Sequence, residues 1–253
     1  KAINAGCDIM LLPPDPAVAV ATVKAAVDSN IIPLEIINQK CLKILKAKEK
    51  WGINKFTPVK TENIYRDLTN DSTLLLLKKL CEASITLLKN DDNLIPVKAG
   101  SFKSIASLSM GSNVKTEFQN QLSYSNRISH FQIKSQPSAK EMKSIIDTLK
   151  NFELVIIGIH GLSQTPNKNY GITAEENQLI DSISKKSQII VTVFGNPYSI
   201  GFLKKSDTLN TLLLAYNPLE EVQVAAANVI TGAMSVNGQL PVTITPKLKY
   251  GQG

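Results

Sequence analysis

The stretch ELVIIGIHG, Glu153 to Gly161, decides the fold of most of this chain. Its centre, Leu154 to Ile159, carries apolar or small residues at every position, without the polar alternation of a half-exposed strand. A strand that is apolar on both faces is typical of a mainly parallel sheet with helices on each side. A second run, Ile189 to Phe194, repeats the pattern. We therefore predict an α/β sandwich built around these two strands.

Further strands are expected on both sides of this stretch, with helices between them. Each candidate is a short apolar or alternating run bounded by turn residues. The six strand candidates are Ile85–Leu88, Ser104–Leu108, Ile128–Ile133, Leu154–Ile159, Ile189–Phe194 and Thr211–Ala215. After them, Gly238–Thr245 is expected to be extended. The predicted architecture is a mainly parallel six-stranded sheet sandwiched by helices.

Capping motifs predict where several helices begin. Two pairs have the spacing at which an N-cap hydroxyl and a Glu three residues later satisfy each other's backbone N–H groups. These capping boxes are Ser138 with Glu141 and Thr173 with Glu176. We also expect Asp71 to cap a helix that runs through Cys81, and Asn217 to cap a helix that Gly232 terminates.

The first fifty residues predict a second structural unit. They read as a strand, a Pro-Pro-Asp loop and two helices, and so few elements cannot close a hydrophobic core. We interpret them as the last strand and helices of an incomplete (β/α)8-type barrel. The expected elements are a strand at Cys7–Leu12 and helices at Ala17–Asp28 and Leu34–Trp51, the second ended by Gly52. The expected domains are a barrel remnant at 1–52, a linker at 53–70, the sandwich at 71–246 and a tail at 247–253.

Composition argues against several classes of function. The net charge is +7, but the lysines are scattered over helices without an aromatic-basic pattern, so we expect solvated helix faces and no nucleic-acid partner. No apolar run approaches the roughly 20 residues of a membrane span. No metal or other cofactor is expected. The three cysteines are interpreted as buried free thiols, not as a disulfide framework or zinc site: Cys7, Cys41 and Cys81.

Two side chains are candidate substrate contacts. His160 follows a predicted parallel strand, at the end of the sheet where loops often bind ligands. Asp15 lies in a loop that would face the active side of a barrel. A purely structural role is the competing interpretation for both. The loop Ser163–Gly171 is polar, but Lys168 is its only charge, so it offers no carboxylate for acid–base chemistry.

Three sequence segments, in this order, resemble segments of family 3 glycoside hydrolases. They are AINAGCDIMLLPPDP with its following helices (Ala2–Ile53), CEASITLLKNDDNLIPV (Cys81–Val97) and VITGAMSVNGQLPVTI (Val229–Ile244). The resemblance implies a (β/α)8-type barrel followed by an α/β sandwich with a six-stranded sheet. It also implies hydrolysis of β-linked sugars with retention, by a carboxylate nucleophile and an acid/base about 5 Å apart. The family's nucleophile is an Asp on a strand before the first segment, which this sequence does not contain.

The resemblance also bears on the branch of the family. Members of the β-glucosidase branch usually carry an acidic EGxDR-like stretch after the IIGI strand, where this chain has SQTPNKNYG, Ser163 to Gly171. That difference favours the bacterial β-N-acetylglucosaminidase branch, whose acid/base is a His-Asp dyad on an earlier barrel loop. The isolated chain is then expected to be inactive and to need the missing barrel as its partner, while the compartment stays open. The alternatives are a β-glucosidase or β-xylosidase, or a non-catalytic carbohydrate-binding or scaffold domain.

Overall fold

The computed structural model describes residues 1–55, 57–124, 127–204 and 206–253. It divides into two compact units, which we call the helical unit, Lys1–Asp67, and the sandwich unit, Leu68–Gly253. Residue 56 of the predicted linker lies outside the described residues. None of the helices in the described ranges combines the length and hydropathy that a bilayer crossing requires.

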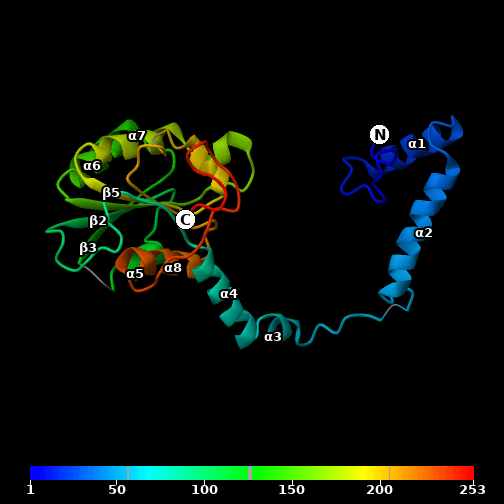
Figure 1. Cartoon of the computed structure of the whole chain (residues 1–253), viewed down its shortest axis with the longest axis horizontal. Coiled ribbons are helices and arrows are strands. Elements are labelled where there is room, and N and C mark those ends of the chain that lie inside the picture. Colours follow the sequence, from blue (N-terminus) through cyan, green and yellow to red (C-terminus); the bar gives the residue numbers. More distant parts are fainter. Residues whose placement is uncertain (56, 125–126, 205) are drawn as a thin grey trace. The chain divides into compact units, whose positions relative to one another are not determined.

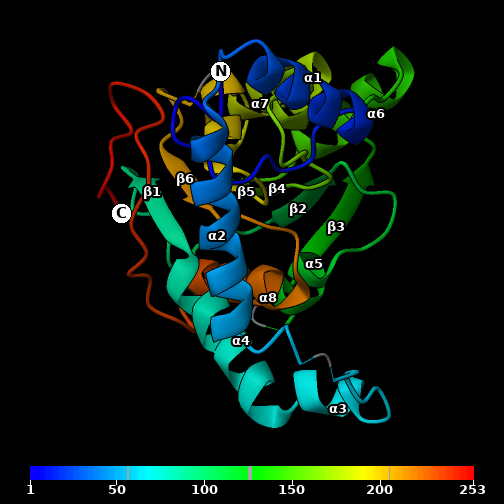
Figure 2. The ribbon, with the colours of Figure 1, turned by 90° about the vertical axis from the view of Figure 1, so that its right-hand side faces the viewer.

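The sandwich unit is built on one six-stranded sheet, in the order β1-β6-β5-β4-β2-β3 (Figure 2). Strands β2 to β6 are parallel to their neighbours, and only β1 at one edge runs antiparallel, to β6. The prediction of a mainly parallel six-stranded sheet is therefore confirmed. The strands are β1 (Thr86–Asn90), β2 (Ile105–Met110), β3 (Ile128–Ile133), β4 (Leu154–Ile159), β5 (Gln188–Val193) and β6 (Thr211–Leu214).

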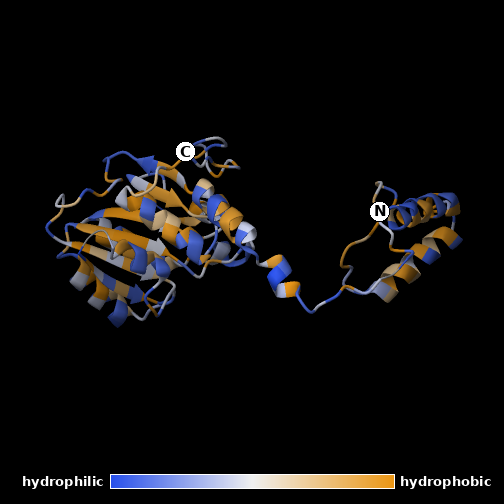
Figure 3. Cartoon of the chain, turned by 90° about the horizontal axis from the view of Figure 1, so that it is seen from below, coloured by the Kyte–Doolittle hydropathy of each residue, from blue (hydrophilic) through white to orange (hydrophobic). Residues whose placement is uncertain are grey.

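Helices cover both faces of this sheet. Helices α6 (Ala139–Leu149) and α7 (Ala174–Ser184) lie on one face, and α5 (Glu117–Leu122) and α8 (Glu220–Thr231) lie on the other (Figure 1). Helix α4 (Asp71–Ser84) packs against α8. The strands of the sandwich unit are mainly hydrophobic, whereas hydrophobic and hydrophilic residues alternate along its helices (Figure 3).

The side chains of β4 alternate between two hydrophobic cores. Val155 and Ile157 belong to the core under α6 and α7, whereas Leu154 and Ile156 belong to the core under α5 and α8. Every residue of β4 is buried. Full burial of one such side chain is worth about 1.5–3 kcal/mol, so the apolar side chains of this strand together contribute on the order of 10 kcal/mol to the hydrophobic driving force.

Both predicted capping boxes are present. The hydroxyls of Ser138 and Thr173 accept from the N–H groups of Glu141 and Glu176, and each Glu carboxylate accepts from the backbone N–H of its partner. Gly232 ends α8 in the left-handed conformation, with φ of 79°, which a glycine adopts without the steric penalty of a Cβ.

Two other predicted caps are wrong by a short shift. Asn70 caps α4, because its extended backbone lets its Oδ1 accept from the N–H of Thr73 at 3.0 Å, and Asp71 is already inside the helix. Asn217 accepts from Leu219 N at 2.9 Å, which closes a turn just before α8 begins at Glu220. Asx side chains stabilise turns and caps with similar hydrogen bonds, so the sequence did not distinguish them.

The segment Gly238–Thr245 forms no strand, although it holds backbone hydrogen bonds to neighbouring segments. Gly238 donates to Ile85 O at 3.2 Å, and Leu240 exchanges hydrogen bonds with Gln252 and Gly251. Residues 247–253 therefore pack back on the sandwich unit, and Leu248 is fully buried.

The helical unit contains α1 (Pro16–Asp28) and α2 (Leu34–Lys50). The short α3 (Ile64–Leu68) lies inside the predicted linker, and its last residue is the first of the sandwich unit. The strand predicted at Cys7–Leu12 is wrong: the segment is irregular, with bends at Asp8 and Leu12, and the described part of the helical unit contains no strand with which it could pair. Neither α1 nor α2 buries a residue. Cys7 and Cys41 are consequently exposed, against the prediction, and Cys81 is buried as predicted.

The alternation of β4 between two cores gives a test of the sandwich. Replacing Ile157 with Ala opens a cavity in the core under α6 and α7, and we expect the free energy of unfolding to fall by about 3 kcal/mol. Urea unfolding followed by circular dichroism measures this. The control is Val114→Ala in the same unit, where the side chain is 70% exposed and the loss should stay within about 0.5 kcal/mol. Equal losses in the two variants would contradict the described core.

Candidate functional site

The carboxyl ends of the parallel strands form the edge of the sandwich unit where a ligand would be expected. The chain runs from β2 outward to β3 and returns to β4 on the other side of β2, and open α/β sheets bind ligands at such a reversal. Here the reversal is filled by backbone. The N–H of His160 donates to Met110 O at 2.9 Å, and a Cβ on Gly111 would collide with the carbonyl oxygen of His160.

His160 follows β4 and turns its ring into the core under α5 and α8. The ring is stacked on Phe194, with centroids 4.4 Å apart and an interplanar angle of 13°. Its Nε2 lies close to Gly158: a Cβ added to this glycine would be only 2.7 Å from that nitrogen. The Nε2 atom has no hydrogen-bond partner among the described residues. Burial lowers the pKa of His160 to about 4. The side chain is thus a neutral aromatic packing group.

Asp15 lies in the helical unit, where its carboxylate caps α1. Its Oδ1 accepts from Ala17 N at 2.9 Å and from Val18 N at 3.1 Å. These are orphan N–H groups of the first helical turn, and the negative charge also opposes the positive end of the helix dipole. Asp15 and His160 belong to different units, and each is explained by contacts within its own unit.

Glu176 is a buried carboxylate to which sequence reasoning assigned only a capping role. Oε2 accepts from Thr173 N at 3.0 Å, but Oε1 has no partner among the described residues. Desolvation raises the pKa of Glu176 to about 7. No local pattern indicates this burial, because capping-box glutamates are usually solvated.

The loops after β4 and β5 bring three aromatic rings together. Tyr170 belongs to the 3-10 helix η1 (Asn167–Gly171), and Tyr198 and Phe202 belong to η2 (Pro197–Phe202). The Tyr170 centroid lies 6.3 Å from that of Tyr198 and 6.1 Å from that of Phe202. Sequence reasoning missed this cluster, since its members are separated along the chain. Their shared position after two neighbouring parallel strands was the available signal.

The backbone of η1 is held in an uncommon conformation. Lys168, Asn169 and Tyr170 all have φ between 53° and 58°, in the left-handed region. Each such non-glycine residue costs about 1–2 kcal/mol, so the surrounding structure must enforce the turn. Ser163 N donates to Tyr170 O at 2.8 Å, and a side chain at Gly171 would press on Ser163 N at 3.1 Å.

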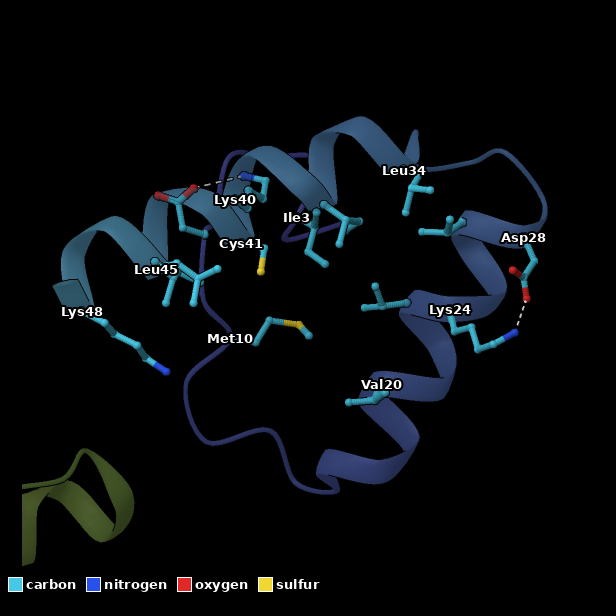
Figure 4. Close-up of a pocket in the computed structure, with 15 residues that line it drawn as sticks. Ile3, Met10, Val20, Lys24, Asp28, Leu34, Lys40, Cys41, Leu45 and Lys48 are labelled. Atoms are coloured by element: carbon cyan, nitrogen blue, oxygen red, sulfur yellow. Dashed lines mark hydrogen bonds and ion pairs between the residues drawn. The ribbon is translucent and has the colours of Figure 1, made fainter. Parts of the chain in front are cut away.

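The helical unit carries an apolar groove of about 700 Å³ between α1 and α2. Ile3, Met10, Val20, Cys41 and Leu45 point into it (Figure 4). Charged side chains lie at its rim, where Asp8 forms ion pairs with Lys40 and Lys43. The distance from Lys40 Nζ to Asp8 Oδ1 is 3.5 Å. Hydrogen bonding from Lys43 lowers the pKa of Asp8. The groove can bury apolar side chains but presents no pair of free carboxylates.

No metal centre is formed by the part of the chain that the structure describes. There, no group of three or more His, Cys, Asp or Glu side chains is placed to hold an ion. Near the described carboxyl edge lie a neutral buried histidine, the buried Glu176 and, beside it in the first turn of α7, the half-buried Glu175.

Comparison with known proteins assigns the sandwich to a family. The model of the Glycosyl hydrolase family 3 C-terminal domain matches residues 85–252. A beta-xylosidase of Formosa agariphila is 23% identical over 87% of this chain and 35% of that protein. Probable beta-D-xylosidase 7 of Arabidopsis thaliana is 29% identical over 39% of this chain and 14% of that protein. This chain belongs to glycoside hydrolase family 3.

A solved structure shows the same fold. The family 3 beta-N-acetylglucosaminidase from Paenibacillus sp. str. FPU-7 superposes with a TM-score of 0.71 at 22% identity. The match covers 96% of this chain and 47% of that protein. The chain thus spans about a third of the Formosa agariphila protein and about half of the Paenibacillus protein.

The two buried ionisable groups give opposing pH dependences of stability. Folded Glu176 keeps its proton up to about pH 7, whereas the unfolded chain loses it near 4.5. The unfolded state then binds fewer protons, so this contribution falls as pH rises through that window. Folded His160 loses its proton near pH 4 and the unfolded chain near 6.5, so its contribution rises with pH between those values.

Replacing Glu176 with Gln removes the contribution to stability that falls as pH rises, and it keeps the capping hydrogen bond. We expect the free energy of unfolding at pH 7.5, relative to that at pH 4.5, to increase by on the order of 2 kcal/mol over the wild type. Urea unfolding at a series of pH values measures the two profiles. Glu175→Gln, at the neighbouring position of the same helical turn, should change the profile much less, because burial is the main cause of the raised pKa of Glu176 and the charge of Glu175 only adds to it. Parallel wild-type and Glu176→Gln profiles would refute the buried-carboxyl assignment.

Proposed function

We propose that this chain is the C-terminal portion of a retaining family 3 β-N-acetylglucosaminidase, in which the barrel carries the chemistry. The observation that carries the proposal is the loop after β4. From Ser163 to Gly171 it contains no carboxylate, at the position where members of the glucosidase branch carry an acidic stretch. Retaining hydrolysis needs two carboxyl-type groups about 5 Å apart or an equivalent acid/base, and this loop offers none.

Three further carboxylates support an inactive isolated chain. Asp15 is engaged by two backbone N–H groups, and Glu176 is buried with one oxygen held by its capping box. Asp8 is neutralised by Lys40 and Lys43. None of these carboxylates is both exposed to a ligand and free of a structural partner, as a nucleophile or general acid must be.

The proposed role of the helical unit is to complete a barrel supplied by the rest of the enzyme. Helices α1 and α2 expose an apolar face, and the groove between them is lined mainly by aliphatic side chains. Apolar surface of this kind is normally covered by protein. Packing it against preceding barrel elements would bury Met10, Cys41 and Leu45 together.

A β-xylosidase is the second candidate. The curated relatives from Formosa agariphila and Arabidopsis thaliana carry that name, and their identity to this chain is as high as that of the acetylglucosaminidase structure. In that case an acid from the C-terminal domain would have to reach the barrel site. Glu175, half-buried in the first turn of α7, is the carboxylate next along the chain after the neutral loop.

Turnover of aryl glycosides separates these proposals. We expect the full-length enzyme to hydrolyse aryl β-N-acetylglucosaminide at least tenfold faster, in kcat/KM, than aryl β-xyloside or β-glucoside, and the 253-residue chain to hydrolyse none of them. Glu175→Gln in the full-length enzyme should change kcat less than twofold. A preference for the xyloside, with a loss of 10²-fold or more in Glu175→Gln, would instead establish the second candidate.

A further inference from the structure

We propose that Tyr170, Tyr198 and Phe202 form a platform on which a pyranose ring of a β-linked oligosaccharide stacks. The choice of a sugar ligand rests on the proposed function, whereas the location rests on the geometry of the loops after β4 and β5. The site would hold a distal part of the glycan, because the platform itself carries no group that cleaves a glycosidic bond.

Two of the three rings are exposed, and Tyr170 lies close to both of them. Tyr198 is 43% and Phe202 is 42% exposed, and Tyr170 is half-buried. The Tyr170 and Tyr198 rings are inclined by 29°, and Tyr170 and Phe202 by 45°. Three neighbouring rings on one edge of a sandwich form an apolar patch, and such patches on soluble proteins commonly mark binding sites.

The platform is fixed before any ligand arrives. Asn177 of α7 donates from Nδ2 to Phe202 O at 3.2 Å and accepts at Oδ1 from Lys204 N at 2.7 Å. Asn196 accepts at Oδ1 from Tyr198 N at 3.0 Å. On the other side, the left-handed turn of η1 sets the direction of Tyr170. Rigid aromatic side chains lose little conformational entropy on binding, so a preformed site of this kind binds more tightly than a mobile one.

The chemistry of the patch favours a β-linked sugar. The face of an aromatic ring carries negative electrostatic potential, and a β-pyranose directs its axial C–H groups, which are weakly positive, toward its ring faces. The equatorial hydroxyls then point sideways to polar neighbours. Here those neighbours are uncharged amides and one cation, all exposed, on the same loop: Asn167, Lys168 and Asn169. The loop contains no acidic residue, so it does not select a cationic ligand.

Binding to the 253-residue chain tests the platform without any catalytic step. Chitotetraose and cellotetraose are titrated into the chain and followed by calorimetry and by NMR shifts. We expect saturable binding with Kd in the millimolar range or tighter, weakened at least tenfold in Tyr198→Ala and in Phe202→Ala. Tyr198→Phe, which keeps the ring, should bind within threefold of the wild type. The matched control is Tyr250→Ala, an exposed tyrosine of the same unit, 75% exposed, which should bind as the wild type does.

Several results would overturn the platform. These are no saturable binding of either sugar, equal affinity in Tyr198→Ala and wild type when circular dichroism shows both folded, or equal weakening in Tyr250→Ala. Sedimentation that shows self-association abolished by Tyr198→Ala, without sugar binding, would assign the patch to a second copy of the chain and also overturn it. Tyr198-dependent binding of cellotetraose in preference to chitotetraose supports the platform. Whether the acetylglucosaminidase proposal stands is decided separately by the aryl glycoside assay.

Discussion

Strand β4 lies between two parallel neighbours and buries all six of its residues, and this burial on both faces constrains the rest of the sandwich unit. A strand with no solvent face requires a helical layer on each side, which α6 and α7 supply on one face and α5 and α8 on the other. Parallel neighbours require crossover connections, and α5, α6 and α7 lie in the crossovers from β2 to β3, from β3 to β4 and from β4 to β5. One apolar hexapeptide therefore dictates the layers, the connectivity and the edge at which the loops gather.

The same burial shapes the chemistry at that edge. Because Gly158 lacks a side chain, the His160 ring folds back over β4 and stacks on Phe194, so the histidine extends the core instead of facing solvent. The close approach of the loops after β2 and β4 fills the reversal point of the sheet with backbone. Any ligand-directed groups must then lie further out, on the loops after β4 and β5, and this is where the exposed rings are found.

Local patterns sufficed to predict the strands and capping boxes of the sandwich unit. They failed for features that depend on residues far away along the chain. The limits of β4 and the capping boxes at Ser138 and Thr173 followed from the sequence, because their causes lie within a few residues. The strand at Cys7–Leu12 was wrong, since a strand exists only with a neighbour to receive its hydrogen bonds. The burial of Glu176 and the meeting of Tyr170 with Tyr198 depend on loop conformations, including three successive left-handed residues, which no local pattern encodes.

The neutral loop after β4 connects the two proposals. A domain that supplied a general acid from this loop would need a carboxylate there, in a setting that tunes its pKa and lets it move into the barrel site. A domain freed of that task can keep the loop rigid and uncharged. The left-handed turn at Lys168–Tyr170 and the clamp of η2 by Asn177 are consistent with the second case: they immobilise the loops around an aromatic surface. Such rigidity would hinder a general acid that has to move into the barrel site. It suits a stacking platform, because an aromatic ring that is already ordered loses the least conformational entropy when a sugar binds to it.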